Sequence, residues 1–450
     1  MARLFGTDGV RGEANTKLPP ELAYRMGRAA TIYFGQHSEG TPQILIGRDT
    51  RISGEMLESA LVAGICSAGG NAILAGVVPT PAIAYLAKKL HAAAGIVISA
   101  SHNPFHDNGI KFFGGDGYKL PDKVEDEIEQ IVRDIESGKK FNRPTGEEVG
   151  HIERRQNLLE DYIGFVMSTT SERFDGMKIV LDCANGAAFK AMPTILERLG
   201  AELILIGDNP NGININDGCG STHLDNLRTA VTKNQADIGI AHDGDADRCL
   251  CVDETGNVID GDHIMIICAK LMQDVGALPD KTVVTTVMSN IGFRQALAEM
   301  NLSYEITAVG DRYVLENMRA KNHKLGGEQS GHIIFSDYST TGDGLITALQ
   351  VLTAMKKSKQ PASKLNALMT TYPQVLLNVR VKDKAACENS EAVKLAIAEG
   401  EIELGTTGRI LVRASGTEPL VRVMAEGPDK IQLNRICNKI AAEIEKIACA

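Results

Sequence analysis

The chain has 450 residues, of which 43% are hydrophobic and 23% are charged, a composition typical of a folded protein that is too long for one compact core. Its formal net charge of −10 and its lack of a basic helical stretch argue against binding of nucleic acid, although local arginines and lysines could still hold a small anion. We therefore expect several domains and a small-molecule partner.

The chain opens with MARLFGTDGV, which lacks the basic region and apolar core of a secretory signal. No run of about 18 apolar residues that could span a membrane occurs in the sequence. The nine cysteines include no C-x-x-C pair and favour reduced thiols over a disulfide framework, with Cys249 and Cys251 at alternate positions of a strand. We expect a cytoplasmic protein with neither a membrane partner nor structural zinc.

Three stretches of the chain repeat one order of elements. The first has a strand at QILIGRDT, a helix over residues 54–68 and a strand at NAILAG, and the order recurs from near residues 178 and 281. Short runs rich in Val and Ile that alternate with helical periods predict mostly parallel sheets covered on both faces. We predict three similar α/β domains with mixed or parallel sheets, whose functional loops follow the strands.

The pattern changes at TTYPQV, near residue 371. VLLNVRV, GRILVRAS and PLVRVMAEG predict a more exposed sheet, and isoleucines at 436, 440, 444 and 447 predict an amphipathic closing helix. The predicted fold class is α/β with four domains, the last a smaller α+β domain. Polar stretches divide them into residues 1–150, 151–255, 256–370 and 371–450.

The first loop with candidate chemistry lies in GIVISASHNPFHDNGIKFF, residues 95–113. Ser, Asn and Pro are ordinary turn residues, so Ser101 by itself fits plain loop chemistry. His102 beside it and Lys111 on the following strand add a donor for a developing charge and a candidate proton carrier. Ser99, the competing hydroxyl, sits at the strand end and is better explained by packing.

The second loop, IAHDGDADRCLCVDETG, places Asp243, Asp245 and Asp247 at alternate positions after an apolar strand. An EF-hand is excluded because Arg248 occupies the position of its required glycine and strands replace its flanking helices. Three neighbouring carboxylates fit a Mg²⁺ site completed by phosphate or water. The alternative is a solvated acidic turn, in which the three charges would repel one another.

The third loop, GGEQSGH, alternates Glu328, Ser330 and His332, which share one face of an extended segment. Carboxylate and hydroxyl groups there suit a sugar, but a polar strand entry beside a glycine turn fits equally well.

The fourth loop, RASGTEPLVR, has the composition of a phosphate-binding turn, with a solvated turn as the alternative. Its candidate residues are Arg413, Ser415, Gly416, Thr417 and Arg422. The sequence contains neither a Walker A motif nor G-x-G-x-x-G, so the fingerprints of nucleotide hydrolysis and dinucleotide binding are missing.

The segments FGTDGVRG, SASHNP, DGDADR, GGEQSGH and RASGTEPLVRV stand in this order from end to end of the chain. Together they resemble the α-D-phosphohexomutase family, in particular its bacterial members that act on glucosamine phosphates. The resemblance implies four domains around a central cleft, and it implies that Ser101 carries a phosphoryl group beside Mg²⁺. The metal ligands would be Ser101, Asp243, Asp245 and Asp247.

The resemblance also implies roles for the remaining candidates. Catalytic roles fall to Ser101, His102, Lys111, Arg11 and Arg248. Substrate contacts fall to Glu328, Ser330, His332, Arg413, Ser415, Gly416, Thr417 and Arg422.

The implied reaction converts glucosamine 6-phosphate into glucosamine 1-phosphate through a sugar 1,6-bisphosphate, for cell-wall precursor synthesis, by an enzyme that forms a homodimer. From the residues alone, two other classes stay open. One is a metal-dependent phosphatase with Asp243 as nucleophile, and the other is a sugar-phosphate sensor without catalysis. No residue in the sequence demands the 2-amino group, so glucose and mannose phosphates are the nearest alternative substrates.

Overall fold

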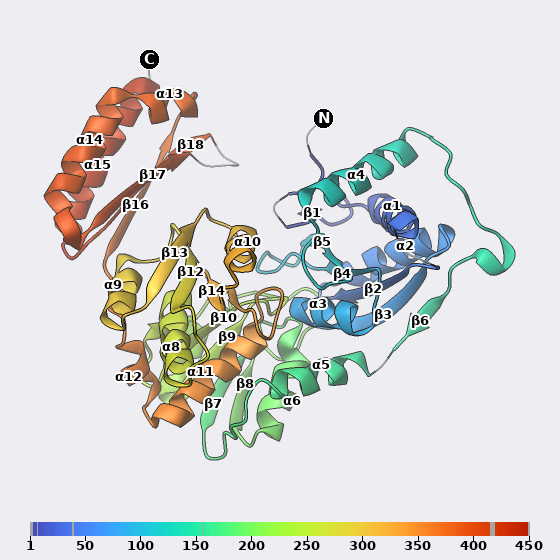
Figure 1. Cartoon of the computed structure of the whole chain (residues 1–450), viewed down its shortest axis with the longest axis horizontal. Coiled ribbons are helices and arrows are strands. Elements are labelled where there is room, and N and C mark those ends of the chain that lie inside the picture. Colours follow the sequence, from blue (N-terminus) through green and yellow to red (C-terminus); the bar gives the residue numbers. More distant parts are fainter. Residues whose placement is uncertain (1–2, 7, 38–39, 156, 415–418, 449–450) are drawn as a thin grey trace. The chain divides into compact units, whose positions relative to one another are not determined.

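The computed structural model describes residues 3–6, 8–37, 40–155, 157–414 and 419–448 (Figure 1). The chain forms two compact units. The larger unit comprises residues 1–288 and 302–368, and the smaller comprises residues 289–301 and 369–450.

The first domain is built on a six-stranded sheet of order β1-β5-β4-β2-β3-β6. Its strands are β1 (Val10–Glu13), β2 (Gln43–Arg48), β3 (Asn71–Val77), β4 (Ala94–Ile98), β5 (Asp107–Gly114) and β6 (Ile152–Arg154). Its helices are α1 (Pro20–His37), α2 (Gly54–Ser67), α3 (Thr80–Lys89) and α4 (Asp122–Glu136), with a 3₁₀ turn at Gly146–Glu148.

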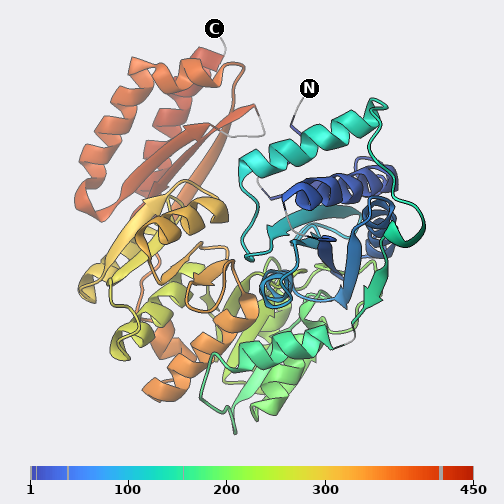
Figure 2. The ribbon, with the colours of Figure 1, turned by 45° about the vertical axis from the view of Figure 1, so that its right-hand side comes forward.

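Helices cover both faces of this sheet because its strands are apolar on both sides. Side chains of α1, α2 and α4 share one core with Ile44 and Ile46 of β2, and α1 and α4 lie side by side (Figure 2). On the other face, Ile83 of α3 packs where Gly47 and Gly95 carry no side chain. Added β-carbons there would approach Ile83 to within 2.6 Å and 2.7 Å, so the glycines permit close packing of α3.

The second domain has a five-stranded sheet of order β11-β10-β9-β7-β8. Its strands are β7 (Lys178–Asp182), β8 (Glu202–Ile206), β9 (Ile238–His242), β10 (Cys249–Asp253) and β11 (Val258–Ile259). Its helices are α5 (Leu158–Met167), α6 (Ala188–Arg198) and α7 (Asp225–Asn234).

The third sheet has the order β13-β12-β14-β15. Its strands are β12 (Thr282–Thr286), β13 (Ser303–Thr307), β14 (Leu325–Gly327) and β15 (Ile333–Phe335). The accompanying helices in the larger unit are α8 (Gly261–Asp274), α10 (Asp311–Lys321), α11 (Gly344–Ser358) and α12 (Ala362–Asn366), while α9 (Ile291–Glu299) belongs to the smaller unit.

The three sheets share one four-strand arrangement, which confirms the predicted repeat. The arrangement is β5-β4-β2-β3 in the first sheet, β10-β9-β7-β8 in the second and β15-β14-β12-β13 in the third. In each, the last three strands are mutually parallel and the first is antiparallel to its neighbour. The sheets are therefore mixed, because each candidate loop is a short turn, and a short turn returns the chain as an antiparallel neighbour.

The C-terminal domain has a different, entirely antiparallel sheet of order β16-β18-β17. Its elements are β16 (Gln374–Arg380), α13 (Lys384–Asn389), α14 (Glu391–Leu404), a 3₁₀ turn at Gly405–Thr407, β17 (Arg409–Ala414), β18 (Leu420–Glu426) and α15 (Lys430–Ala448). Helices α14 and α15 lie on the same side of this sheet (Figures 1 and 2). Ile436, Ile440 and Ile444 of α15 are buried against Val421 and Val423, as the amphipathic pattern predicts.

None of the helices in the described ranges combines the length and apolar character that crossing a bilayer requires.

Candidate active site

Loops from three domains line one cavity in the larger unit. Ser101 lies beyond the end of β4, Asp243 directly follows β9 and Glu328 directly follows β14. These are the carboxyl ends of strands at which ligands bind in α/β sheets. The cavity has a volume of about 410 Å³. Its charged and polar lining includes Arg11, Ser101, Asp247, Arg248, Glu328 and His332.

Ser101 is held in an uncommon backbone conformation with φ of 52°, which costs an L-residue about 1–2 kcal/mol. Its carbonyl accepts hydrogen bonds from Arg51 Nη2 at 3.0 Å and Asn216 Nδ2 at 2.9 Å. The Ser101 N–H donates to Ser99 Oγ at 3.0 Å. Ser99 is fully buried, in agreement with the prediction that it packs at the strand end. The backbone is thus fixed, and the Ser101 hydroxyl donates to Asp243 Oδ2 at 2.6 Å.

The three aspartates among the predicted metal ligands lie together and are buried. Asp243, Asp245 and Asp247 each offer an oxygen within 4.8 Å of the others. Asp245 Oδ2 accepts from Lys111 Nζ at 2.8 Å, and Asp247 Oδ2 lies 3.4 Å from His332 Nδ1. The Oδ1 atoms of Asp245 and Asp247 are buried without a hydrogen-bond partner among the described residues. Such a set of hard oxygen ligands fits a Mg²⁺ ion.

The raised pKa of Asp243 also indicates a cation at this site. Burial, together with the negative charges of Asp247 and Asp245, raises the pKa of Asp243 to about 8. A buried carboxylate in this position needs a cation to hold it ionised, because like charges and desolvation both favour the protonated form. A divalent ion would remove this penalty.

His102 and Lys111 differ in protonation. Burial, aided by the charges of Arg248 and Arg11, lowers the pKa of His102 to about 4, so its imidazole is neutral at neutral pH. The Nδ1 atom of His102 lies 3.3 Å from Ser101 Oγ. Burial would lower the pKa of Lys111, but Asp245 and Asp8 raise it above its ordinary value, so Lys111 stays a cation. Of the two, His102 is the group that can accept a proton.

The remaining predicted residues of the larger unit differ in position. The Arg11 guanidinium pairs with Asp8 at 2.5 Å, and Arg248 Nε lies 3.9 Å from an oxygen of Asp247. Glu328 accepts from the Gly310 N–H at 3.1 Å. Ser330 is exposed and is not among the described residues that line the cavity. Its sugar contact stays a prediction.

Comparison with known proteins connects this geometry to one family over the whole chain. Profiles of the phosphoglucomutase/phosphomannomutase family match alpha/beta/alpha domain I at residues 2–139, domain II at 160–256, domain III at 260–372 and the C-terminal domain at 376–443. The chain belongs to this family.

Individual relatives agree with the family assignment. The chain is 53% identical to a phosphoglucosamine mutase of Brevibacillus brevis over 447 residues, which cover 99% of each protein. A phosphoglucomutase/phosphomannomutase family protein of Burkholderia thailandensis has a similar fold, with a TM-score of 0.79 at 24% identity, covering 99% of this chain and 97% of that chain. So has an N-acetylphosphoglucosamine mutase of Aspergillus fumigatus in complex with GlcNAc-6P and magnesium, with a TM-score of 0.71 at 17% identity and coverage of 99% and 96%.

In the C-terminal domain of this family member, Arg413 on β17 and Arg422 on β18 are directly paired across the sheet. Burial and the neighbouring charge of Arg422 lower the pKa of Arg413. Two adjacent guanidinium groups favour an anion, because its charge would relieve their repulsion. Ser415, Gly416 and Thr417, the other predicted members of this loop, lie outside the described residues.

Several supporting side chains were not among the predicted residues. Asp49 and Arg51 follow β2, and Asp311 begins α10 shortly after β13, so both positions carry the same strand-end signal as the predicted loops. Asp8 lies inside the quoted segment FGTDGVRG. Lys119, which pairs with Asp8 at 2.6 Å, carries no pattern that would distinguish it from a surface lysine.

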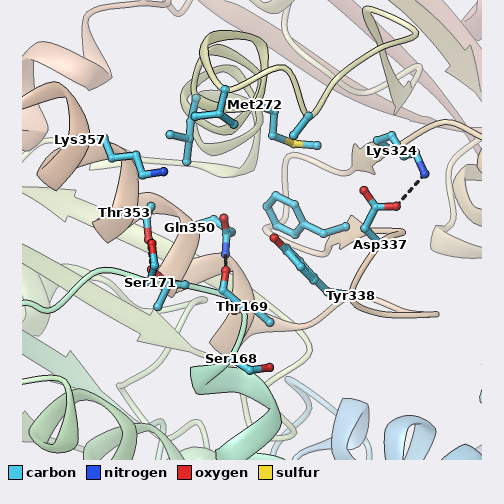
Figure 3. Close-up of a pocket in the computed structure, with 15 residues that line it drawn as sticks. Ser168, Thr169, Ser171, Met272, Lys324, Asp337, Tyr338, Gln350, Thr353 and Lys357 are labelled. Atoms are coloured by element: carbon cyan, nitrogen blue, oxygen red, sulfur yellow. Dashed lines mark hydrogen bonds and ion pairs between the residues drawn. The ribbon is translucent and has the colours of Figure 1, made fainter.

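A second pocket, of about 320 Å³, shares no residue with the described lining of the Ser101 cavity (Figure 3). It lies beside α8 and α11, where Gln350 Nε2 donates to the Thr169 carbonyl at 3.1 Å. Lys324 there pairs with Asp337 at 2.7 Å. The Lys324–Asp337 ion pair lies outside the Ser101 cavity, so it can be compared with the ion pairs near Ser101.

Proposed function

We propose that the protein is an isomerase that interconverts glucosamine 6-phosphate and glucosamine 1-phosphate, with Ser101 as the phosphoryl carrier and a sugar 1,6-bisphosphate as intermediate. One observation carries the proposal: the Ser101 hydroxyl lies 2.6 Å from a buried triad of aspartates in a cavity that also contains Arg11 and Arg248. The full-length relative described as a phosphoglucosamine mutase supports this choice of sugar.

Charge neutralisation explains the grouping of residues. A phosphoserine carries about two negative charges at neutral pH. A Mg²⁺ ion held by Asp243, Asp245, Asp247 and the Ser101 phosphate would polarise the transferring group. Arg11 and Arg248 line the same cavity and add positive charge to a reaction that depends mainly on alignment and electrostatic stabilisation.

Proton transfer follows from the protonation states of the site. In the first half-reaction the sugar hydroxyl oxygen forms a bond to the phosphorus on Ser101, the serine Oγ–P bond breaks, and the proton of the sugar hydroxyl passes to Ser101 Oγ. In the second, Ser101 Oγ forms a bond to the other phosphoryl group and the bond from that phosphorus to the sugar oxygen breaks. The serine proton passes to the departing sugar oxygen by way of neutral His102, whose Nδ1 lies 3.3 Å from Ser101 Oγ. Lys111 remains protonated and orients Asp245.

Binding of the sugar is divided among the remaining predicted residues. Glu328, Ser330 and His332 contact the sugar in this proposal. Arg413 and Arg422, with Ser415, Gly416 and Thr417, hold the phosphate that is not reacting, which must be either the 1- or the 6-phosphate as the bisphosphate turns over. The adjacent guanidinium groups on β17 and β18 support that role.

Three further statements belong to the proposal. We place the domain boundaries close to the predicted residues 150, 255 and 370, with the first two a few residues later because β6 and β11 belong to the first and second sheets. We place the protein in the cytoplasm, because the cysteines in the described ranges are free thiols. We expect a homodimer, which light scattering of the purified protein would test.

The test compares substrates on one phosphorylated preparation. Activated with a sugar 1,6-bisphosphate and Mg²⁺, the protein should convert glucosamine 6-phosphate faster than glucose or mannose 6-phosphate, as followed by phosphorus NMR. Peptide mapping should place the phosphate on Ser101. Ser101→Ala should abolish turnover with unchanged circular dichroism, while Ser168→Ala, in the pocket of Figure 3, should retain it.

Three results would contradict the proposal. Turnover by Ser101→Ala would remove the carrier role. Phosphate on Asp243 with steady release of inorganic phosphate would indicate a phosphatase. Faster turnover of glucose 6-phosphate would change the substrate.

A further inference from the structure

A chain of alternating charges runs behind the aspartate triad. Lys111 Nζ lies 2.8 Å from Asp245 Oδ2 and 3.1 Å from Asp8 Oδ2. Lys119 Nζ lies 2.6 Å from Asp8 Oδ1 and 2.5 Å from Asp311 Oδ2. We name this series, Asp245–Lys111–Asp8–Lys119–Asp311, the ion-pair chain. At most a fifth of any of its side chains is exposed, so solvent screens its interactions less than those of surface pairs.

The ion-pair chain joins three domains of the larger unit. Asp8, Lys111 and Lys119 come from the first domain, Asp245 follows β9 of the second, and Asp311 begins α10 of the third. At its far end, Asp311 Oδ2 lies 3.4 Å from His332 Nε2. This nitrogen accepts a hydrogen bond from the Gly342 N–H at 3.0 Å, so it has no proton to donate to Asp311. The other nitrogen of His332 faces Asp247. The series is therefore connected to the triad by ion pairs at Asp245, and its other end lies near the histidine that faces Asp247.

These contacts determine which oxygens of the triad remain available. Asp245 uses Oδ2 for Lys111 and for the Thr80 hydroxyl, and Asp247 presents Oδ2 to His332. The Oδ1 atom of each is buried without a hydrogen-bond partner among the described residues. A carboxylate anchored by one oxygen presents the other in a fixed direction, and such outer partners tune metal affinity.

We propose that Asp8, Lys119 and Asp311 are positioning residues for the metal ion, which act through Lys111 on Asp245. The inference rests on the proposed function only in assuming that the triad binds a divalent cation. Lys119, together with Arg11, neutralises Asp8, so that Asp8 does not draw Lys111 away from Asp245. Asp311 secures Lys119 from the third domain, so the metal ligands reach their geometry when the three domains are joined.

If only Coulomb attraction mattered, Lys119→Met would bind the cation more tightly, whereas loss of positioning would weaken its binding. Removing the positive charge of Lys119 would strengthen the attraction between the triad and a cation if charge alone mattered. Loss of positioning instead weakens binding, by about 10- to 100-fold for outer-shell partners of metal ligands. The sign of the change for Lys119→Met therefore separates the two explanations.

The experiment measures the affinity of the full-length protein for Mn²⁺ by electron paramagnetic resonance, without substrate and with Mg²⁺ as competitor. Intact mass confirms that all samples have the same phosphoserine content. The double variant Lys119→Met/Asp311→Asn removes the ion pair without changing net charge. Its matched control, Lys324→Met/Asp337→Asn, removes the pair seen in Figure 3. We expect the dissociation constant to rise about tenfold or more in Lys119→Met and in the double variant, and to stay at the wild-type value in the control.

Each outcome decides one question. Wild-type affinity in the double variant, or tighter binding by Lys119→Met, overturns the inference and leaves the proposed function standing. A wild-type protein that binds no Mn²⁺ refutes the metal site itself. If the double variant does not fold by circular dichroism, the near-isosteric Asp311→Asn carries the same test: weaker binding supports the positioning role, and unchanged binding overturns it.

Discussion

Replacing Arg51 by Met should lower both the free energy of unfolding and the rate of phosphoryl transfer, because this side chain fixes the backbone of the Ser101 loop. The guanidinium is fully buried and pairs with the equally buried Asp49 at 2.8 Å. It also donates to four backbone acceptors of one loop. They are the carbonyl oxygens of Ser101, Asn103, Pro104 and Asp107.

The expected loss of stability and of rate follows from the groups that lose their partner when Arg51 is replaced. Methionine keeps much of the apolar stem but removes the charge, so Asp49 becomes a buried carboxylate without its cation. Breaking a buried ion pair in this way costs about 3–5 kcal/mol. The loop carbonyls lose the Arg51 donors as well, and Ser101 loses one of the contacts that hold its left-handed conformation. A displacement of about 1 Å at a reacting atom lowers the rate about a hundredfold.

The assay combines urea denaturation with kcat for glucosamine 6-phosphate. Arg28→Met is the matched control, since Arg28 is as buried as Arg51 but donates to the carbonyls of Ser67 and Asn142, far from the Ser101 loop in sequence. We expect Arg28→Met to lose stability, by about 1–3 kcal/mol for buried groups left unpaired, and to retain kcat. If Arg51→Met keeps wild-type kcat in conditions where it is folded, the loop does not depend on this guanidinium and our reasoning is wrong.

Two further predictions concern the residue proposed to bind the non-reacting phosphate and the proton acceptor. Arg413→Ala should raise the KM for glucosamine 6-phosphate about 10- to 100-fold, since a hydrogen bond to a charged group contributes about 1.5–3 kcal/mol. An unchanged KM would show that Arg413 does not bind this phosphate. Because the pKa of His102 is about 4, its imidazole should stay neutral from about pH 8 to about pH 5, as an NMR titration of the His102 ring would show. A His102 pKa near the ordinary histidine value would argue against this residue as the proton acceptor. The ring titration is the readout because the phosphates of enzyme and substrate themselves titrate at about pH 6 and would lower kcat/KM there.

The repeat and the candidate loops were predictable from sequence because both depend on local order. Short Val- and Ile-rich runs reveal buried strands, and ligand-binding loops in α/β sheets lie at the carboxyl ends of strands. Ser101, Asp243 and Glu328 all follow this rule. Mixed sheets were among the predicted possibilities, but which strand of each sheet runs antiparallel was not predicted, since a strand's apolar pattern does not state its direction.

The protonation states and partners of the site were decided only by tertiary structure. His102 and Lys111 are both candidate catalytic groups in the sequence, but burial and the arginines keep His102 neutral, while Asp245 and Asp8 keep Lys111 charged. Lys119 and Asp311 are 192 residues apart, and no periodic pattern links them. Ion pairing and desolvation depend on distance and burial in the folded chain, so the sequence determined which chemical groups are present, and folding determined which of them meet and in which charge state.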